Sequence, residues 1–380
     1  MFFNAVYQKG NYNMLKTTLT LSSLALLAAA GTSAQATVVD SLGSNPHPLI
    51  VAGDPFDPVN PDSPDNRVDP NVLSSRFAGV VSIYIETDQG GFICTGTAIS
   101  KRHILTAGHC VDPNENGTTT GVNRVRAVFN HDGPYYDNPA RNLIDANVGS
   151  IAIHPDYAGF GNCPPGVDSF CVNDDLAVLT LEEDIPDGVP TYSLYMGQTA
   201  PGDQFTMVGY GTSGDGYWGY YVDPEFDIKR VGGNIVDLFD GDDEQGFGGQ
   251  NEVWYSDFDG FDADWGFIDF FCTLGLACSE VLPNDVETVL GGGDSGGPSF
   301  ILTASGEYML AANNTFGGDG MAWTGGAFGS YSGGIILAAY RDWLIRVTNG
   351  QAAFVPEPES LALLGLGLLS LAGLSRRKKA

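Results

Sequence analysis

Short apolar runs separated by turn residues dominate the chain from residue 79 onward, and they predict strands rather than helices. Ten runs are expected to be strands: 79–87, 92–100, 125–130, 148–154, 176–181, 205–211, 228–236, 252–258, 298–303 and 308–313. One helix is predicted near the end, where Leu337, Tyr340, Leu344 and Val347 recur at helical spacing. Many short strands with one late helix indicate an all-β protein of paired antiparallel barrels.

Two stretches interrupt this pattern. Residues 37–67 are rich in Pro, Asp and Asn, which predicts a linker or propeptide without a core. Residues 211–290 are rich in Gly, Asp and aromatic side chains, and we expect long surface loops around one or two strands there.

The first 36 residues contain no Asp or Glu, and an apolar run at 19–30 precedes Ala34-Gln35-Ala36. A short apolar run followed at once by small residues is typical of a secretory signal peptide, here cut before Thr37. A buried N-terminal helix is the alternative, but the small residues after the run favour the signal.

Composition adds an acidic balance, with 17 Lys and Arg against 46 Asp and Glu and a net charge of −29. Residues 37–354 alone carry 11 basic and 44 acidic side chains, a net charge of −33. This charge excludes nucleic acid as a natural partner, because that affinity depends on neutralising phosphates with Lys and Arg. Anionic membrane surfaces are disfavoured for the same reason.

Six cysteines in an exported chain should be paired. Of the fifteen pairings that six cysteines allow, the spacings favour three local ones. These are Cys94–Cys110, Cys163–Cys171 and Cys272–Cys278. A metal site is the alternative, but the chain has no Cys-x-x-Cys pair and no histidine cluster to support it.

Three segments carry candidate chemistry: LTAGHC at 105–110, NDDLAVLTL at 173–181 and GGGDSGGP at 291–298. Their residues and order resemble those of the trypsin-like, chymotrypsin-fold serine endopeptidases, over roughly residues 68–347. The resemblance implies two six-stranded antiparallel β-barrels with a C-terminal α-helix. It also implies hydrolysis of peptide bonds in a protein or peptide substrate, with no cofactor required.

The same resemblance assigns a catalytic triad. Ser295 would be the nucleophile and His109 its general base, because a serine hydroxyl needs a base of moderate pKa. Asp175 would orient the imidazole, since it directly precedes the apolar run of the second motif. Asp174 is the rival for that role. By the family match, the amides of Gly293 and Ser295 would form the oxyanion hole.

Activation in this family depends on a new N-terminus that pairs with the Asp before the nucleophile, here Asp294. We expect that terminus at Val68 after Arg67, because Val68 lies 41 residues before His109. The run 50–53, Ile-Val-Ala-Gly, is more similar in sequence to the family's N-terminal motif, Ile-Val-Gly-Gly, but it lies further upstream.

The family's specificity position falls on Val289, six residues before Ser295, which argues against a preference for Lys or Arg. The segment Thr315-Phe316-Gly317 is similar to the strand that binds substrate backbone.

Asp112, Asn114 and Asn116 begin like a calcium loop, with oxygen ligands at alternate positions and Gly117 for the turn. We favour a solvated Asx-rich turn over a structural calcium ion here, because Asn123 replaces the usual final Glu. The acidic run at 257–264 is a second, weaker calcium candidate.

The chain ends with Pro356-Glu357-Pro358, an apolar run at 361–374 and a basic tail. This segment resembles the PEP-CTERM sorting signal of Gram-negative bacteria, which implies an exosortase-type enzyme as processing partner. An ordinary membrane anchor is the alternative, and the basic tail fits either. Both place the body outside the cytoplasm, in the periplasm, at the cell surface or secreted.

We therefore expect an exported, monomeric serine endopeptidase that is transiently anchored at its C-terminus. Its parts are a signal peptide (1–36), a linker or propeptide (37–67), a protease domain (68–350) and a sorting segment (351–380). A catalytically inactive trypsin-fold surface binding protein is the alternative, and a structural protein whose acidic loops bind calcium is a third.

Overall fold

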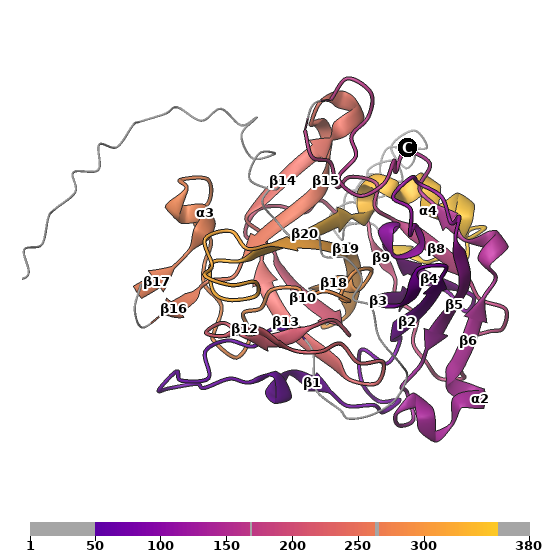
Figure 1. Cartoon of the computed structure of the whole chain (residues 1–380), viewed down its shortest axis with the longest axis horizontal. Helices are drawn as coiled ribbons and strands as arrows, with labels where there is room; N and C mark the ends of the chain where they lie inside the picture. Colours follow the sequence, from indigo (N-terminus) through magenta and orange to yellow (C-terminus); the bar gives the residue numbers. More distant parts are fainter. Residues whose placement is uncertain (1–49, 168, 263–265, 356–380) are drawn as a thin grey trace, which may run out of the picture.

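The computed structural model describes residues 50–167, 169–262 and 266–355 (Figure 1). The expected signal peptide and all but the start of the sorting segment lie outside these residues. Two large sheets and a short C-terminal helix form most of the described body, as the sequence predicts. All pairings within these two sheets are antiparallel except those of β9 with β19 and β21.

The first sheet runs in the order β6-β5-β2-β3-β4-β8-β7. Its strands are β2 (Val80–Thr87), β3 (Gly90–Ala98), β4 (His103–Thr106), β5 (Val122–Val128), β6 (Leu143–Ala146), β7 (Ala152–Ile153) and β8 (Ala177–Thr180). A bridge between Ala146 and Leu181 joins β6 to the end of β8, so the sheet closes into a barrel. Alternate residues of β2, Val81, Ile83 and Ile85, fill its interior, as period-2 side chains should.

The second sheet follows the path β1-β13-β10-β18-β19-β20-β15-β14, with β9 and β21 beside β19. Its strands are β1 (Val68–Asp69), β9 (Leu194–Tyr195), β10 (Gln204–Gly209), β13 (Lys229–Ile235), β14 (Leu238–Asp242), β15 (Gly248–Asp257), β18 (Pro298–Leu302), β19 (Tyr308–Gly318), β20 (Tyr331–Ile336) and β21 (Phe354–Val355). Strand β14 follows β13 after two residues and pairs with β15 at the far end of the path, which closes this barrel too.

A shared apolar cluster joins the two barrels. It combines Leu105 and Val178 from the first barrel with Val208, Phe300 and Leu310 from the second. The C-terminal helical segment, η7 (Leu337–Tyr340) and α4 (Arg341–Val347), packs on the same cluster through its buried residues, as its spacing predicts.

The sheets hold seven and ten strands rather than six each, because short terminal strands and the β14–β15 hairpin extend them. The stretch 211–290, called the insertion below, also forms β11 (Ser213–Asp215), β12 (Gly219–Val222), β16 (Gly260–Asp262), β17 (Gly266–Ile268) and α3 (Phe270–Thr273). Short helical turns complete the description: η2 (Pro64–Arg67), η3 (His109–Val111), η4 (Tyr135–Asp137), α2 (Pro139–Asn142), η5 (Val148–Ser150) and η6 (Asp243–Gln245).

Three expectations differ from the structure. The stretch 211–290 forms seven strands and a short helix rather than loops around one or two strands, because its segments pair with one another and with the second barrel. The run 148–154 is a strand only at Ala152–Ile153, because a helical turn capped by Asn147 occupies its first half. The segment 50–67 does not behave as an unpacked linker. Ile50, Val51 and Ala52 are fully buried against the second barrel, since their apolar side chains can pack where the flanking Asp and Pro residues cannot.

Candidate active site

His109 and Asp175 are brought together by two neighbouring strands. Strand β4 pairs antiparallel with β8, with Thr106 opposite Ala177. The turn after β4 carries His109, and Asp175 lies just before β8. His109 Nδ1 lies 2.6 Å from Asp175 Oδ2, and the His109 amide donates to Asp175 Oδ1 at 2.7 Å. Two bonds to one carboxylate fix the position and the tautomer of the imidazole.

Asp174 faces a different histidine. Its Oδ1 lies 3.0 Å from His154 Nδ1, and its amide donates to the Tyr340 hydroxyl at 3.1 Å. Asp174 has a φ of +61°, so adjacent aspartates can turn their carboxylates in different directions. The geometry therefore favours Asp175 over its rival as the partner of His109.

The second barrel supplies Ser295 in the turn before β18. The Ser295 carbonyl accepts the Thr95 amide of β3 at 2.8 Å, which ties the turn to the first barrel. The Ser295 side chain is 3% exposed, and its Oγ has no hydrogen-bond partner among the described residues. A serine hydroxyl without a partner is available for chemistry, and catalytic hydrogen bonds often tighten only when substrate binds.

Glycines shape this turn. Gly293 has a φ of +103° and Gly296 a φ of +82°. A Cβ on Gly296 would lie 2.0 Å from Thr106 Oγ1, so only glycine fits against β4 there. The Thr95 hydroxyl donates to the Gly293 carbonyl at 2.9 Å, which holds the residue expected to supply one oxyanion amide.

Asp294 is fully buried and accepts two amides, Gly211 at 2.7 Å and Gly291 at 2.8 Å. Burial raises the pKa of Asp294 to about 6, although these amides and the Arg230 charge act against that rise. A buried carboxylate at this place would be stabilised by a closer positive charge.

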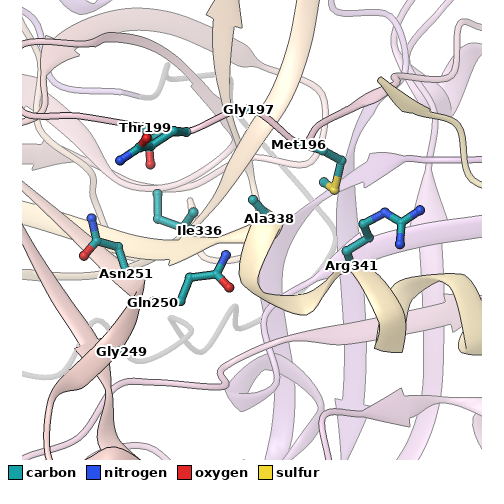
Figure 2. Close-up of a pocket in the computed structure, with 10 residues that line it drawn as sticks. Met196, Gly197, Thr199, Gly249, Gln250, Asn251, Ile336, Ala338 and Arg341 are labelled. Carbon is teal, nitrogen blue, oxygen red and sulfur yellow. The ribbon is translucent and has the colours of Figure 1, made fainter. Parts of the chain in front are cut away.

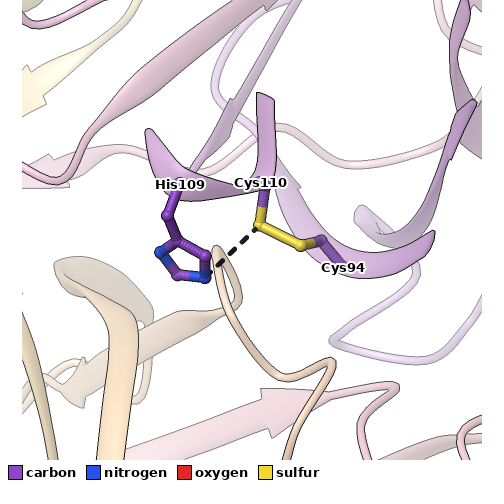
Figure 3. Close-up of side chains that lie close together, drawn as sticks. All are labelled: Cys94, His109 and Cys110. Atoms are coloured by element: carbon purple, nitrogen blue, oxygen red, sulfur yellow. Dashed lines mark hydrogen bonds between the residues drawn. A yellow bond between two sulfur atoms is a disulfide. The ribbon is translucent and has the colours of Figure 1, made fainter. Parts of the chain in front are cut away.

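All three expected disulfides, Cys94–Cys110, Cys163–Cys171 and Cys272–Cys278, are present. The first ties β3 to the His109 turn, and Cys110 Sγ lies 3.9 Å from His109 Nε2 (Figure 3). The second closes the loop 163–171, and Phe160, three residues before that loop, packs edge-on against the His109 ring at 5.3 Å. The sequence did not reveal Phe160, because no local motif marks an aromatic residue that contacts His109 from a separate loop.

The proposed pocket residues lie on two segments near the nucleophile. Thr315, Phe316 and Gly317 belong to β19, and the preceding Asn314 carbonyl accepts the Gly296 amide at 2.8 Å. A Cβ on Gly317 would lie 3.6 Å from the Leu290 carbonyl, so this part of β19 faces the segment before Ser295. Val289 is fully buried among Val51, Phe258 and Phe328. The surroundings of Val289 are therefore apolar.

The structure contradicts the activation site expected at Arg67. The Arg67 guanidinium is buried, pairs with Asp62 at 2.6 Å and donates to three carbonyls, so a protease could not reach it. Val68 is 39% exposed in β1, where it pairs with Arg230.

Ile50 and Val51 are instead bound to the segments that surround Asp294. The Ser213 hydroxyl donates to the Ile50 carbonyl, and Thr288 Oγ1 donates to the Val51 carbonyl at 2.6 Å. The Ala52 amide donates to the Gly214 carbonyl at 2.9 Å. Counting back from His109 missed this segment, because residues 54–79 form an additional stretch between it and the first barrel.

The Asp112 loop forms turns rather than a convergent set of ligands. Asp112 Oδ2 accepts the amides of Asn116 and Gly117 at 2.8 and 2.6 Å. Asn116 Oδ1 accepts from Thr118, and the Asn114 amide donates to the Thr120 carbonyl. These contacts are those of an Asx-rich turn.

A pocket of about 530 Å³ lies elsewhere on the second barrel (Figure 2). It is lined by the 196–199 segment, the start of β15 and residues near η7, and it includes none of the candidate catalytic residues. Arg341 at its rim pairs with the neighbouring Asp342. This pocket supplies no groups to the candidate chemistry.

Two β-barrels, with a His–Asp pair on one and a glycine-flanked serine on the other, give the protein a chymotrypsin-like fold. Comparison with known proteins agrees. The Trypsin family model matches residues 74–221, and the PEP-CTERM protein-sorting motif matches residues 354–379. The chain thus carries a trypsin-family domain and a PEP-CTERM motif.

Curated relatives include serine protease Hayan of Drosophila melanogaster, 33% identical over 101 residues, and venom serine protease Bi-VSP of Bombus ignitus, 33% identical over 93 residues. These matches cover 27% and 24% of this chain but only 13% and 21% of the relatives.

Among solved structures, a thermostable serine protease AL20 from an extremophilic microorganism matches 71% of this chain and 97% of its own, at 14% identity and a TM-score of 0.43. A structure titled HL collagenase matches 72% of this chain and 94% of its own, at 17% identity and a TM-score of 0.42.

Within the described residues, none of the helices has the length and apolar character needed to cross a bilayer.

Proposed function

We propose that this protein is an exported serine endopeptidase that uses His109, Asp175 and Ser295. The observation that carries the proposal is the 2.6 Å contact between His109 Nδ1 and Asp175 Oδ2, on a barrel that also binds the Ser295 carbonyl through Thr95. Cys110 Sγ lies 3.9 Å from His109 Nε2 and 3.7 Å from the Ser295 carbonyl oxygen, which supports placing the three residues at one site.

In the proposed reaction, His109 Nε2 takes the Ser295 hydroxyl proton as Oγ attacks the substrate carbonyl. The carbonyl oxygen gains the negative charge and accepts hydrogen bonds from the amides of Gly293 and Ser295. His109 then gives the proton to the departing amine, which leaves an ester on Ser295. Water, activated by the same imidazole, hydrolyses the ester and releases the acid. Asp175 stabilises the imidazolium and stays ionised throughout.

The pocket base supports a preference for apolar side chains at the position before the cleaved bond. Val289 provides no charge, and Phe258 and Phe328 surround it. A Lys or Arg side chain would lose its hydration there without gaining a carboxylate partner.

Activation in this proposal requires cleavage between Leu49 and Ile50. The new ammonium group of Ile50 would supply the positive charge that buried Asp294 lacks. The support is the burial of Ile50 and Val51 beside the Leu290 and Val289 segment. N-terminal sequencing of active enzyme tests this step: Ile50 as first residue is expected, and activity in chains that still carry Leu49 would overturn it.

The PEP-CTERM motif supports export in a Gram-negative bacterium and removal of the tail by an exosortase-type enzyme. The proposed enzyme works as a monomer on protein or peptide substrates. Its strongly acidic surface would disfavour acidic substrates.

Hydrolysis of an unfolded protein substrate tests the activity. The matured wild type is expected to release peptides, and Ser295→Ala and His109→Ala should lower the rate by about 10⁴ to 10⁶. A folded, matured protein without this activity would favour the inactive binding protein instead.

A further inference from the structure

Several carboxylates of the stretch 211–290 lie close together around Phe258, which packs with Val289. Asp237, Asp257 and Asp259 are each at most 3% exposed. Asp257 ends β15, Asp259 precedes β16, and Asp269 caps α3. None of the ion pairs found among the described residues includes any of these four aspartates. Carboxylates buried without a counter-charge are costly, and a bound cation would stabilise this group.

One oxygen in the group has no partner at all. Asp259 Oδ1 is buried and forms no hydrogen bond within the described part of the chain. The other carboxylates each accept one amide: Asp257 Oδ2 accepts that of Phe271, and Asp269 Oδ1 accepts that of Cys272, both at 2.8 Å. Each therefore keeps lone pairs for a further ligand.

The spacing of the oxygens fits a single ion. One carboxylate oxygen from each of Asp257, Asp259 and Asp269 lies within 4.8 Å of the others. Calcium binds oxygens at about 2.3–2.6 Å, so ligands on opposite sides of the ion are up to about 5 Å apart. The donors are all hard carboxylate oxygens without histidine or cysteine, which favours calcium over transition metals.

We propose that Asp257, Asp259 and Asp269 form a binding site for a calcium ion, with Asp237 as a neighbouring carboxylate. Backbone carbonyls or water complete the shell of six to eight oxygens that calcium takes.

The site is connected to the base of the pocket. Phe258, between two of the ligands, contacts the Phe328 ring at 4.7 Å and packs with Val289. Asn234 Nδ2 donates to the carbonyls of Asp257 and Thr288 at 2.6 and 2.8 Å. Thr288 in turn binds Val51. Bound calcium therefore stabilises the pocket base and the buried Ile50–Val51 segment.

Titration of calcium into chelator-treated Ser295→Ala protein tests the site without depending on catalysis. Calorimetry should detect calcium binding that disappears in Asp259→Asn and in Asp269→Asn. Calcium at about 100 times its Kd should raise the Tm of the parent by about 5–10 °C and leave these variants unchanged. With EDTA the variants should be at least as stable as the parent, because they lose a buried repulsive charge, and this shows that they fold.

Asp243→Asn separates this site from a second acidic group, in which Asp243 Oδ1 is likewise buried without a partner among the described residues. Asp243 is 2% exposed and lies in this separate acidic group with Asp242 and Glu252. Its replacement should therefore leave the calcium-dependent rise in Tm unchanged. The proposal is wrong if calcium does not bind, if the shift survives in Asp259→Asn, or if it disappears only in Asp243→Asn. An equal shift with magnesium at the same concentration would overturn the assignment to calcium.

Discussion

Asp175 binds His109 at both the ring and the backbone, through Oδ2 to Nδ1 at 2.6 Å and Oδ1 to the amide at 2.7 Å. The carboxylate is fully buried, so water does not compete for either bond. Asp174, its neighbour in sequence, lies 3.0 Å from His154 instead. The two adjacent carboxylates therefore have different expected roles.

Asp175→Asn should lower kcat by about 10⁴, because an amide cannot hold the imidazole in the tautomer that accepts the serine proton. Asp174→Asn should lower kcat less than about tenfold, because His109 keeps both bonds. Peptide hydrolysis by the two purified variants, each checked for folding by circular dichroism, measures the difference. Equal losses in both would contradict the assignment of Asp175.

Thr95 positions the nucleophile turn from the first barrel. Its hydroxyl donates to the Gly293 carbonyl and accepts the Tyr210 amide at 3.0 Å. Thr95→Val keeps the shape but leaves these two buried groups unpaired, so we expect a loss of about 2–4 kcal/mol in stability and a fall in kcat with KM little changed.

Thr97→Val is the control for that experiment. Thr97 lies in the same strand, is 1% exposed, and its hydroxyl has no partner among the residues that the structure describes. Its replacement should cost little stability and leave kcat unchanged. A similar loss in both valine variants would show that Thr95 acts through general packing rather than through Gly293.

Gly296→Ala tests the close contact between the Ser295 turn and β4. The added Cβ meets Thr106 Oγ1 at 2.0 Å in a backbone with a φ of +82°. We expect loss of activity and a fall of several degrees or more in Tm. Gly306→Ala has a similar φ of +81° but nothing within 4 Å, so it should cost only about 1–2 kcal/mol. Equal effects would mean that backbone strain, not the contact, requires glycine.

Asp294 makes the stability of the uncleaved chain pH-dependent. Burial raises its pKa to about 6 from 3.8, so the folded chain holds this proton more tightly than the unfolded chain. Its stabilising contribution is therefore present below about pH 4 and is lost as the pH rises through about 6, by about 3 kcal/mol in all. Asp294→Asn should remove this part of the dependence of unfolding free energy on pH.

Urea unfolding of Ser295→Ala protein, with and without Asp294→Asn, isolates this contribution as the difference between two pH series. Cleavage after Leu49 should also remove it, since an ammonium group beside the carboxylate lowers its pKa. The same dependence of stability on pH in the Ser295→Ala protein, in its Asp294→Asn variant and in the protein cleaved after Leu49 would contradict the proposed contact of Asp294 with Ile50.

The sequence predicted the barrels and the candidate triad because each depends on local patterns. Ile83 and Ile85 alternate with outward residues, and His109, Asp175 and Ser295 each lie in a short motif. The disulfides could also be predicted from the sequence, because the two cysteines of each pair are close along the chain.

The remaining features depend on contacts between distant segments. Strand β20 contains two glycines and lacks a clear apolar run, so its pairing with β19 and β15 defines it. The expectation at Val68 came from a spacing rule, whereas the proposal of Ile50 rests on its burial in the folded chain. Asp259 and Asp269 are ten residues apart, and only the folded insertion brings their oxygens together.

Reaction with a fluorophosphonate, followed by peptide mapping, tests the central claim most directly. Protein cleaved after Leu49 should carry one phosphonyl group, on Ser295, and labelling should be lost in Ser295→Ala and weakened in His109→Ala. Folded, cleaved wild-type protein that remains unlabelled, or that is labelled at another residue, would contradict the claim that His109, Asp175 and Ser295 form the active site.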